Sequence, residues 1–332
     1  DNKENFIMKY RNLGRSGLKV SELSFGSWVT FNKQVDPNLA EKMFGKCLDA
    51  GINFFDNAEG YERGLSEIVM GKALKALDNS RDSYCVSSKV FFGSHESPLP
   101  TQMGLSRKHV TEACEQALKR LQVDYLDLYF CHRADPETPI GETVSAMHNL
   151  ITQGKILYWG TSEWSAAQIQ EAYEFAKDNN LTPPTMEQPQ YNLLDRERFE
   201  VEYAPIFEKY GMGTTTWSPL ASGALTGKYL NGVPEGSRAS LEGYEWLKKH
   251  MIESDRAKER MKKVGSLMPI AEELGVSLSN LSIAWCLLNP NVSTVILGAS
   301  KLDQLEHNLK SLDASSLLTD EVVYKLNSAL SD

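Results

Sequence analysis

The sequence predicts an α/β fold, a (β/α)8 TIM barrel with an N-terminal β-hairpin and a long loop after the seventh strand. Short apolar segments alternate with helix-length amphipathic segments through eight strand–helix units, which is typical of a parallel sheet. A chain of 332 residues is an ordinary length for one such barrel with insertions. The pattern also permits an open, doubly wound sheet, but eight regular units over about 300 residues favour closure.

We expect residues 8–332 to form this barrel as a single domain. Residues 1–7 are expected to be a leader or an expression remnant, with Met8 as the natural start. The first five residues lack the apolar segment of a signal peptide.

The first half of the chain contains a hairpin and four strand–helix units. The turn Gly14-Arg15-Ser16-Gly17 separates two short strand-like segments, which predicts the hairpin. Asp36-Pro37 has the N-cap and first-turn residues of a helix, and Gly51 ends that helix. In order, the predicted elements are hairpin strands 10–13 and 18–20, barrel strands 23–26, 53–56, 84–89 and 125–131, and helices beginning at Asp36, Ser66, Ser106 and Thr138.

The second half repeats this pattern with one interruption. A segment from Leu220 to about Lys263 separates the seventh strand from its helix, and connections longer than about 15 residues usually serve a function or are disordered. We interpret this segment as a lid over a bound ligand. The remaining predicted elements are strands 156–160, 185–187, 212–217 and 294–297, helices beginning at Ser165 and Ser277, helices 199–210 and 302–312, and a last helix from about Thr319.

Composition excludes several classes of function. The net charge of −9 and pI near 5.3 argue against binding to nucleic acid or to an anionic membrane surface. No apolar run reaches the 18 residues of a membrane span. The five cysteines are scattered, which favours reduced, mostly buried thiols in a cytoplasmic protein. The six histidines show no metal-ligand spacing, so no metal is expected.

Four residues with complementary acid–base chemistry lie at predicted strand ends. Asp56 ends the second barrel strand, and Tyr61 follows it in the next loop. Lys89 lies at the end of the third strand and His132 at the end of the fourth. The carboxyl ends of barrel strands meet on one face, where the active sites of such barrels lie. We therefore predict that these four side chains converge.

These residue types together indicate a proton-donating site. A free tyrosine hydroxyl has a pKa of about 10, and we expect the Lys89 ammonium to lower the pKa of Tyr61 by favouring the phenolate. Asp56 would hold Lys89, and His132 would hydrogen-bond within the site. Taken singly, each residue has a structural interpretation as a cap, a packing residue or the exposed end of a strand. Their joint placement favours catalysis.

The chain resembles the aldo-keto reductases, and within them the voltage-gated potassium channel β-subunit branch with its plant and microbial relatives. The resemblance extends from about Tyr10 to Leu330, and the motifs recur in order. They are Tyr10-Arg-Asn-Leu-Gly-Arg-Ser-Gly-Leu18, Gly104-Leu-Ser-Arg-Lys-His109, Tyr158-Trp-Gly-Thr-Ser162, Trp217-Ser-Pro-Leu-Ala221 and Gly298-Ala-Ser300. It implies a barrel that uses NADPH/NADP+ and a catalytic tetrad of Asp56, Tyr61, Lys89 and His132.

The resemblance also implies the cofactor contacts. Trp217 matches the aromatic residue that stacks on the nicotinamide, and Ser162 with Gln188 matches the pair that binds its carboxamide. Arg238, with Ser300 and Gln304, should favour the 2′-phosphate, because a guanidinium suits phosphate geometry. No GxGxxG follows a strand, so a Rossmann site is not expected. The full implied set is Ser27, Trp28, Gln34, Asp56, Ser162, Gln188, Trp217, Ser218, Pro219, Leu220, Ala221, Ser222, Lys228, Arg238, Gly298, Ser300, Gln304 and Asn308.

Two positions depart from the animal channel subunits. Glu163 stands where those subunits have an arginine, and His307 stands where they have a glutamate. For the substrate pocket we predict an aromatic wall of Trp28, Phe92 and Trp164, which suits small reactive or aromatic aldehydes. Each of these three residues alone is as compatible with packing.

We therefore expect NADPH-dependent reduction of aldehydes or ketones to alcohols, with Tyr61 as the general acid and a small carbonyl compound as substrate. The alternative is a regulatory β-subunit that binds the cytoplasmic domain of a potassium channel and uses NADP(H) as a redox ligand. His132 favours the enzyme, because the animal channel subunits carry asparagine there. The resemblance implies a homotetramer for either function.

Overall fold

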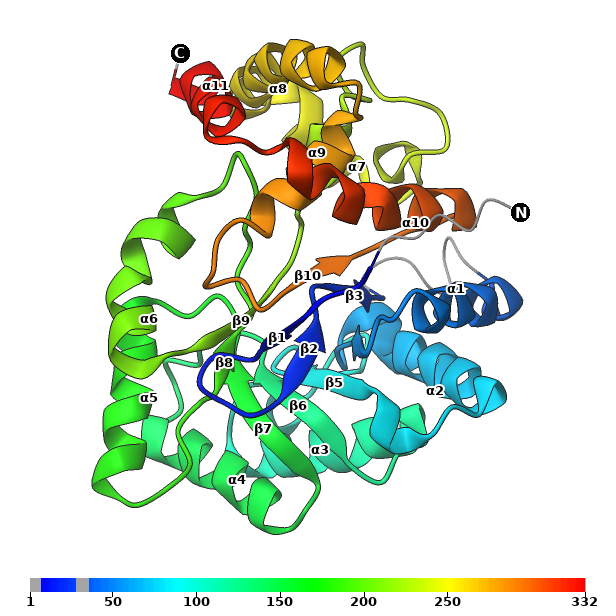
Figure 1. Ribbon diagram of the computed structural model, residues 1–332. Helices are drawn as coiled ribbons and strands as arrows, with labels where there is room; N and C mark the ends of the chain where they lie inside the picture. The colour runs from blue at the N-terminus through cyan, green and yellow to red at the C-terminus, as the bar shows by residue number, and fades with distance from the viewer. Residues whose placement is uncertain (1–6, 28–35, 332) are drawn as a thin grey trace.

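A computed structural model of the chain describes residues 7–27 and 36–331, and of Arg238 only the backbone. Within these residues, eight parallel strands form a closed barrel in the order β10-β3-β4-β5-β6-β7-β8-β9 (Figure 1). The predicted (β/α)8 class is therefore confirmed. The strands are β3 (Leu23–Gly26), β4 (Phe54–Asp56), β5 (Cys85–Val90), β6 (Leu126–Cys131), β7 (Ile156–Thr161), β8 (Met186–Glu187), β9 (Gly213–Thr216) and β10 (Thr294–Leu297).

Helices alternate with the strands and cover the barrel from outside (Figure 1). Several begin at the predicted caps: the Asp36 side chain accepts the backbone N–H of Leu39 at 2.9 Å, and Ser106 accepts that of His109 at 3.1 Å. The helices are α1 (Pro37–Asp49), α2 (Leu65–Leu77), α3 (Arg107–Leu121), α4 (Ile140–Thr152), α5 (Ala166–Asp178), α6 (Ala204–Tyr210), α7 (Glu245–Lys248), α8 (Asp255–Leu274), α9 (Leu278–Cys286), α10 (Leu302–Leu309) and α11 (Asp320–Ser331).

Two predicted helices are interrupted. The segment predicted as one helix over 199–210 is a π-helical turn, Arg198–Glu202, followed by α6, because Pro205 in the first turn of α6 has no N–H to continue a helix. The helix predicted over 302–312 ends at Leu309 and continues as a 3₁₀ segment over Lys310–Leu317. These differences leave the barrel order unchanged.

The N-terminal hairpin closes the amino-terminal end of the barrel. Strands β1 (Tyr10–Asn12) and β2 (Lys19–Ser21) pair antiparallel, as predicted. Leu13 and Val20 are fully buried and belong to the same apolar cluster as the inward-facing Phe54 and Leu128. Within the described residues, the hairpin therefore covers the end of the barrel opposite the carboxyl ends of its strands.

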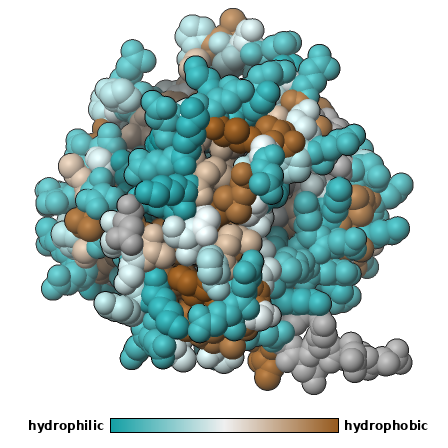
Figure 2. All heavy atoms as spheres, turned by 90° about the horizontal axis from the view of Figure 1, so that it is seen from above, coloured by the Kyte–Doolittle hydropathy of each residue, from teal (hydrophilic) through white to brown (hydrophobic). Residues whose placement is uncertain are grey.

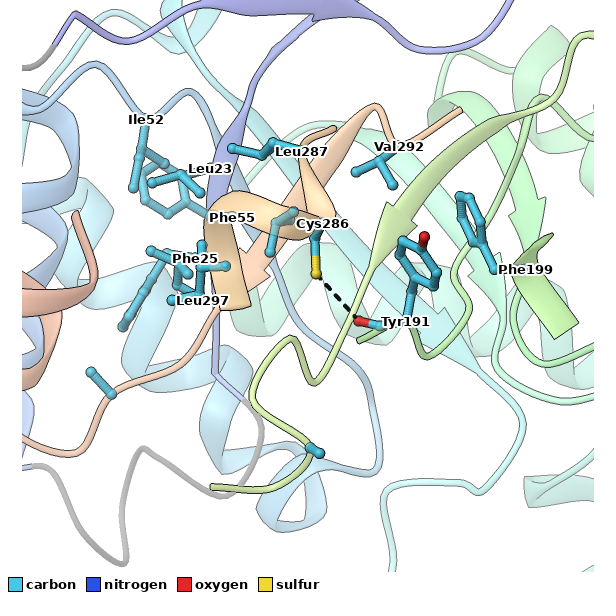
Figure 3. Packing of buried hydrophobic residues seen from close by; sticks show 14 of the residues in the cluster. Leu23, Phe25, Ile52, Phe55, Tyr191, Phe199, Cys286, Leu287, Val292 and Leu297 are labelled. Carbon is cyan, nitrogen blue, oxygen red and sulfur yellow. Dashed lines mark hydrogen bonds between the residues drawn. The ribbon is translucent and has the colours of Figure 1, made fainter. Parts of the chain in front are cut away.

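Side chains alternate between the barrel interior and the surrounding helices, as strand geometry requires. Phe54 and Phe130 face inward, whereas Phe55 and Tyr129 belong to the outer core against the helices. Figure 3 shows part of this outer core, in which Phe25 and Phe55 lie near Leu297. This alternation places every second residue of a strand inside the barrel, up to the strand end.

The long connection after β9 is folded. It contains 3₁₀ turns over Ala224–Thr226 and Arg238–Ser240, then α7, a π-helical turn over Lys249–Glu253, and α8. Tyr244, Leu247 and Met251 are buried and join the outer core. The connection therefore has packed structure of its own and is not an open loop.

Helix α8 packs beside α11 at the edge of the molecule (Figure 1). Its buried residues, Ala257, Val264, Leu267 and Ala271, follow helical spacing on one face. Seen from this side, the surface is mainly hydrophilic and its hydrophobic residues form small groups (Figure 2). No helix in the described ranges is long and apolar enough to cross a membrane.

Gly160 on β7 tests how tightly the barrel is packed. A Cβ atom at this position would lie 2.2 Å from the backbone oxygen of Met186 on β8, and the backbone cannot move without breaking the strand pairing. We expect Gly160→Ala to lower the free energy of unfolding by about 3 kcal/mol. Urea denaturation would measure it. Gly17→Ala is the control, because a Cβ atom at Gly17 meets nothing within 4 Å, and equal stability of the two variants would contradict the packing argument.

Candidate active site

The barrel brings three of the four predicted catalytic residues to adjacent strand ends. Strands β4, β5 and β6 are neighbours. Asp56 is the last residue of β4, Lys89 is one residue from the end of β5, and His132 directly follows β6. Each lies two residues after an inward-facing residue of the same strand, namely Phe54, Ser87 and Phe130. Because side chains alternate along a strand, all three also point into the barrel. The side chains therefore meet inside the carboxyl-terminal mouth of the barrel.

Tyr61 reaches the same point from the loop after β4. It begins a 3₁₀ turn, Tyr61–Gly64, in which Glu62 and Arg63 have left-handed φ angles of 47° and 56°. Left-handed conformations are uncommon in non-glycine residues and persist only where the surroundings hold them. The Tyr61 hydroxyl lies 2.9 Å from Lys89 Nζ, so the predicted convergence of all four residues is present in the structure.

The Lys89 ammonium is fully buried, and each of its three N–H groups has an acceptor. It donates to Asp56 Oδ2 at 2.7 Å, to the Asn57 carbonyl at 2.9 Å and to the Tyr61 hydroxyl. Burial alone would lower the pKa of Lys89, but Asp56 and Tyr61 reverse this effect and the pKa is raised. Lys89 is therefore a cation at neutral pH.

Asp56 connects the ion pair to the rest of the barrel. Its Oδ1 atom accepts hydrogen bonds from Ser87 at 2.7 Å and from the Gln188 amide at 3.2 Å. The same amide donates to Thr215 on β9 at 3.1 Å. A hydrogen-bonded polar layer thus links four strands across the barrel mouth.

The pKa of Tyr61 departs from the sequence-based expectation. Burial raises it above its usual value, and although the Lys89 ammonium acts in the expected downward direction, its effect is smaller. Tyr61 is therefore protonated at neutral pH. A proton donor requires this state, and Lys89 lies where it would stabilise the phenolate left after donation.

His132 is neutral in this site. Burial, followed by the charges of Lys89 and Arg133, lowers its pKa well below the usual value. Its ring is edge-on to Tyr61, with centroids 5.8 Å apart, and to Phe92, with centroids 5.1 Å apart. The buried Nδ1 atom has no hydrogen-bond partner among the described residues. A neutral imidazole carries one N–H donor, which suits it to hydrogen-bond a carbonyl oxygen.

A cavity of about 990 Å³ extends from these residues to the start of α10. Its volume is at the upper end of the range for ligand sites, about 300–1,000 Å³, so it suits an elongated ligand together with a small one. Many predicted residues line it: Asp56, Tyr61, Phe92, His132, Ser162, Gln188, Trp217, Ser218, Pro219, Leu220, Ser222, Lys228, Gly298, Ser300, Gln304 and Asn308.

Other predicted residues lie elsewhere. Ser27 and Ala221 are buried outside the cavity lining, and the Ser27 hydroxyl donates to the Asp56 carbonyl at 3.2 Å. Trp164 is 2% exposed and packs in the outer core, so its prediction as a wall of the substrate pocket is wrong. Its aromatic ring is taken up by helix–barrel packing.

Three predicted positions lie wholly or partly outside the described part of the chain. Trp28 and Gln34 lie outside the described residues, and so does the side chain of Arg238. The backbone of Arg238 begins the second 3₁₀ turn of the connection after β9. The role of Arg238 at the 2′-phosphate stays a prediction.

Glu163 fixes the indole of Trp217 at the cavity edge. Its Oε1 atom accepts the Trp217 indole N–H at 3.1 Å and the Gln190 backbone N–H at 2.6 Å. Its Oε2 atom pairs with Arg198 at 2.9 Å. The backbone of Glu163 is left-handed, with φ 57°, which this dense set of contacts stabilises. The carboxylate therefore orients the aromatic ring that the family resemblance predicts to stack on a nicotinamide.

Glu187, at the end of β8, contacts the backbone of Glu163. Its carboxyl group is fully buried and accepts hydrogen bonds from Thr161 and from the Glu163 backbone N–H. Burial, and to a smaller extent the nearby Glu163 carboxylate, raises the pKa of Glu187 to about 8. Glu187 is therefore largely protonated at neutral pH.

The cavity is also lined by residues that no sequence pattern predicted: Arg133, Gln190, Trp246, His250 and Asp303. Arg133 directly follows the predicted residue His132, and Gln190 lies two residues after the predicted residue Gln188. Closeness in sequence to a predicted site residue was therefore the signal that could have found them. Trp246 and His250 lie one helical turn apart in α7 and the turn after it, in a segment whose fold had no clear sequence pattern. In the described ranges, no group of His, Cys, Asp and Glu is arranged to hold a metal ion. All five cysteines are free and buried, which agrees with the predicted reduced thiols.

Comparisons with known proteins agree with the geometry. A family model described as "Aldo/keto reductase family" matches residues 22–331. A rice protein (Oryza sativa subsp. japonica) is 51% identical over 324 residues, which cover 97% of this chain and 97% of that protein. An Arabidopsis thaliana protein is 49% identical with the same coverage. Both relatives are described as "Probable voltage-gated potassium channel subunit beta".

The raised pKa of Glu187 predicts a specific pH dependence. Its ordinary value is 4.5 and its folded value is about 8, so its protonation stabilises the fold below pH 4.5 and this contribution is lost as the pH rises to 8. Glu187→Gln keeps a side-chain oxygen that can accept from the Glu163 N–H, but its amide does not titrate. We expect the stability of Glu187→Gln relative to wild type to increase from pH 5 to pH 8 in urea denaturation. If the stabilities of wild type and Glu187→Gln changed in parallel between pH 5 and pH 8, the raised pKa of Glu187 would be contradicted.

Proposed function

Because the chain belongs to the aldo/keto reductase family, we propose that it reduces aldehydes or ketones to alcohols with NADPH. Family membership implies oxidoreductase activity and a nicotinamide cofactor, NADH or NADPH. The observation that carries the finer proposal is the 2.9 Å hydrogen bond between the buried Lys89 ammonium and the Tyr61 hydroxyl. It pairs a proton donor with the cation that stabilises its conjugate base.

In this proposal the four residues have separate roles. Tyr61 donates the proton of its hydroxyl to the carbonyl oxygen as negative charge develops there. Lys89 stabilises the resulting phenolate, and Asp56 keeps Lys89 charged and in place. His132, which is neutral, donates an N–H to the carbonyl oxygen and orients it. Water then restores the proton on Tyr61.

The cofactor would occupy the long part of the cavity. When bound, NADPH supplies a hydride, the 4-pro-R hydride by resemblance to the family. Ser162 and Gln188 would hold the nicotinamide carboxamide, and Trp217 would stack on the ring. Ser218, Leu220, Ser222 and Lys228 would hold the pyrophosphate, and Gly298, Ser300, Gln304 and Asn308 the adenosine end. Polar groups from β7, β8, β9 and β10 along one cavity support this fit.

The preference for NADPH over NADH is attributed to Arg238, with Ser300 and Gln304. Ser300 and Gln304 are already joined, since the Ser300 hydroxyl donates to Gln304 Oε1 at 3.0 Å. These groups lie in the cavity lining at the start of α10, and a helix N-terminus favours an anion. The substrate would be a small aldehyde or ketone, with Phe92 as an aromatic wall.

Tyr61→Phe tests the proton donor. The change removes the hydroxyl and keeps the ring that packs against His132, so NADPH binding should be retained. We expect turnover to fall by about 10²–10⁴-fold, measured as NADPH absorbance with a panel of aldehydes, and the same assays with NADH would test cofactor preference. Fluorescence titration of NADPH provides the control for binding. Turnover in Tyr61→Phe equal to wild type would exclude Tyr61 as the acid.

A regulatory β-subunit is the second candidate function. The names of the rice and Arabidopsis relatives favour it, and the same cavity would then hold NADP(H) as a redox ligand. A cytoplasmic location and a homotetramer are part of both proposals. His132 favours the enzyme, because the animal channel subunits carry asparagine at this position. A regulatory sensor gains from slow turnover, whereas a working reductase does not.

Co-purification distinguishes the two functions. If the chain is a channel subunit, it should bind the cytoplasmic domain of a plant potassium channel and elute with it in size-exclusion chromatography. An unrelated cytoplasmic domain of similar charge is the control. Multiple turnovers of NADPH without complex formation would favour the enzyme, whereas a stable complex with no turnover above Tyr61→Phe would favour the subunit.

A further inference from the structure

Arg133 places a positive charge beside the proposed catalytic residues. It lines the cavity together with Tyr61, Phe92 and His132. No carboxylate of the described residues forms an ion pair with it. The Lys89 charge is neutralised by Asp56, so among the described residues the guanidinium of Arg133 is an uncompensated charge at this end of the cavity. This local excess of positive charge contrasts with the net charge of −9 for the chain.

The guanidinium is held at this position. One N–H of Arg133 donates to the His132 carbonyl, and the guanidinium carbon lies 5.7 Å from the centre of the Phe92 ring, within the range of cation–π contact. A guanidinium has five N–H donors, and within the described ranges only one of them has an acceptor. The remaining donors are available to a ligand.

Two observations indicate that this charge serves the substrate and not the cofactor phosphates. Arg133 is close enough to the reacting groups to lower the pKa of His132 and to oppose the rise in the pKa of Tyr61. It follows β6, whereas the pyrophosphate residues proposed above follow β9, and β7 and β8 lie between these strands. The charge is therefore at the tetrad and away from the phosphates.

We propose that Arg133 binds an anionic group of the substrate, so that the preferred substrates are carbonyl compounds that carry a carboxylate. A carboxylate matches the paired N–H groups of a guanidinium. The aldehyde carbon would lie at Tyr61 and His132, and Phe92 would contact the part of the substrate between the two groups. This inference rests on the proposed reductase function and narrows its substrate class from aldehydes in general.

A pair of isosteric substrates tests the inference. In 4-carboxybenzaldehyde and 4-formylbenzamide the reacting aldehyde and the ring are the same, and only the charge differs. We expect wild-type kcat/KM to favour the carboxylate by about 10- to 100-fold, mainly through KM. Arg133→Gln should reduce this ratio by at least about tenfold, and Arg133→Lys, which keeps the charge but not the paired N–H groups, should give an intermediate ratio.

The ratio of the two substrates separates recognition from general damage. A variant that merely disturbs His132 or Phe92 would lower both rates and leave the ratio unchanged, and that outcome would overturn the inference. Arg107→Gln is the matched control, because Arg107 is exposed at the start of α3 and does not line the cavity. Its ratio should equal that of wild type.

Binding without turnover keeps this test independent of the proposed function. Calorimetric titration of the protein with NADP+ present should give a lower dissociation constant for the carboxylate than for the amide, and Arg133→Gln should remove the difference. If neither aldehyde is reduced but this difference is found, the reductase proposal fails and anion recognition stands. If both are reduced and bind equally, the reductase proposal stands and the inference about Arg133 is wrong.

Discussion

The ion pair between Lys89 and Asp56 is the interaction on which the active-site geometry depends. A buried ammonium or carboxylate is costly unless charge and hydrogen bonds compensate it. Here every N–H of Lys89 has an acceptor, and Asp56 accepts from Ser87 and Gln188 as well. These bonds fix the position of Tyr61 and cross the barrel mouth from β5 to β9. The same contacts that satisfy the buried charges therefore position the proton donor.

The protonation states follow from burial and not from ion pairing alone. Desolvation disfavours every charged form, and of Lys89, Tyr61 and His132 only Lys89 has partners strong enough to keep it charged. Tyr61 stays protonated and His132 stays neutral. The result is an acid, a neutral donor and a compensated cation at one point, and this combination suits protonation of a carbonyl oxygen at neutral pH.

A second carboxylate network supports the opposite wall of the cavity. Glu163 joins Trp217, Gln190 and Arg198, and Glu187 holds the Glu163 backbone from the helix-facing side of β8. The second network differs from the first because no cation of the described residues pairs with Glu187, whose carboxyl group is largely protonated at neutral pH. The Lys89–Asp56 network and the Glu163–Glu187 network hold two sides of the cavity in place. The connection after β9, which is built from short turns and helices, forms a third side.

The sequence by itself determined the barrel, the hairpin and the positions of Asp56, Lys89 and His132, because strand alternation, helix caps and strand ends are local patterns. It also placed Tyr61 correctly, since the loop after β4 is short. Only the tertiary structure decided the raised pKa of Tyr61, the burial of Trp164 in the outer core and the contacts of Glu163 with Trp217. It alone revealed the packed connection after β9 and the guanidinium of Arg133 at the cavity, which pairs with no carboxylate of the described residues. These features depend on burial and on contacts between residues far apart in the chain, which no local pattern records.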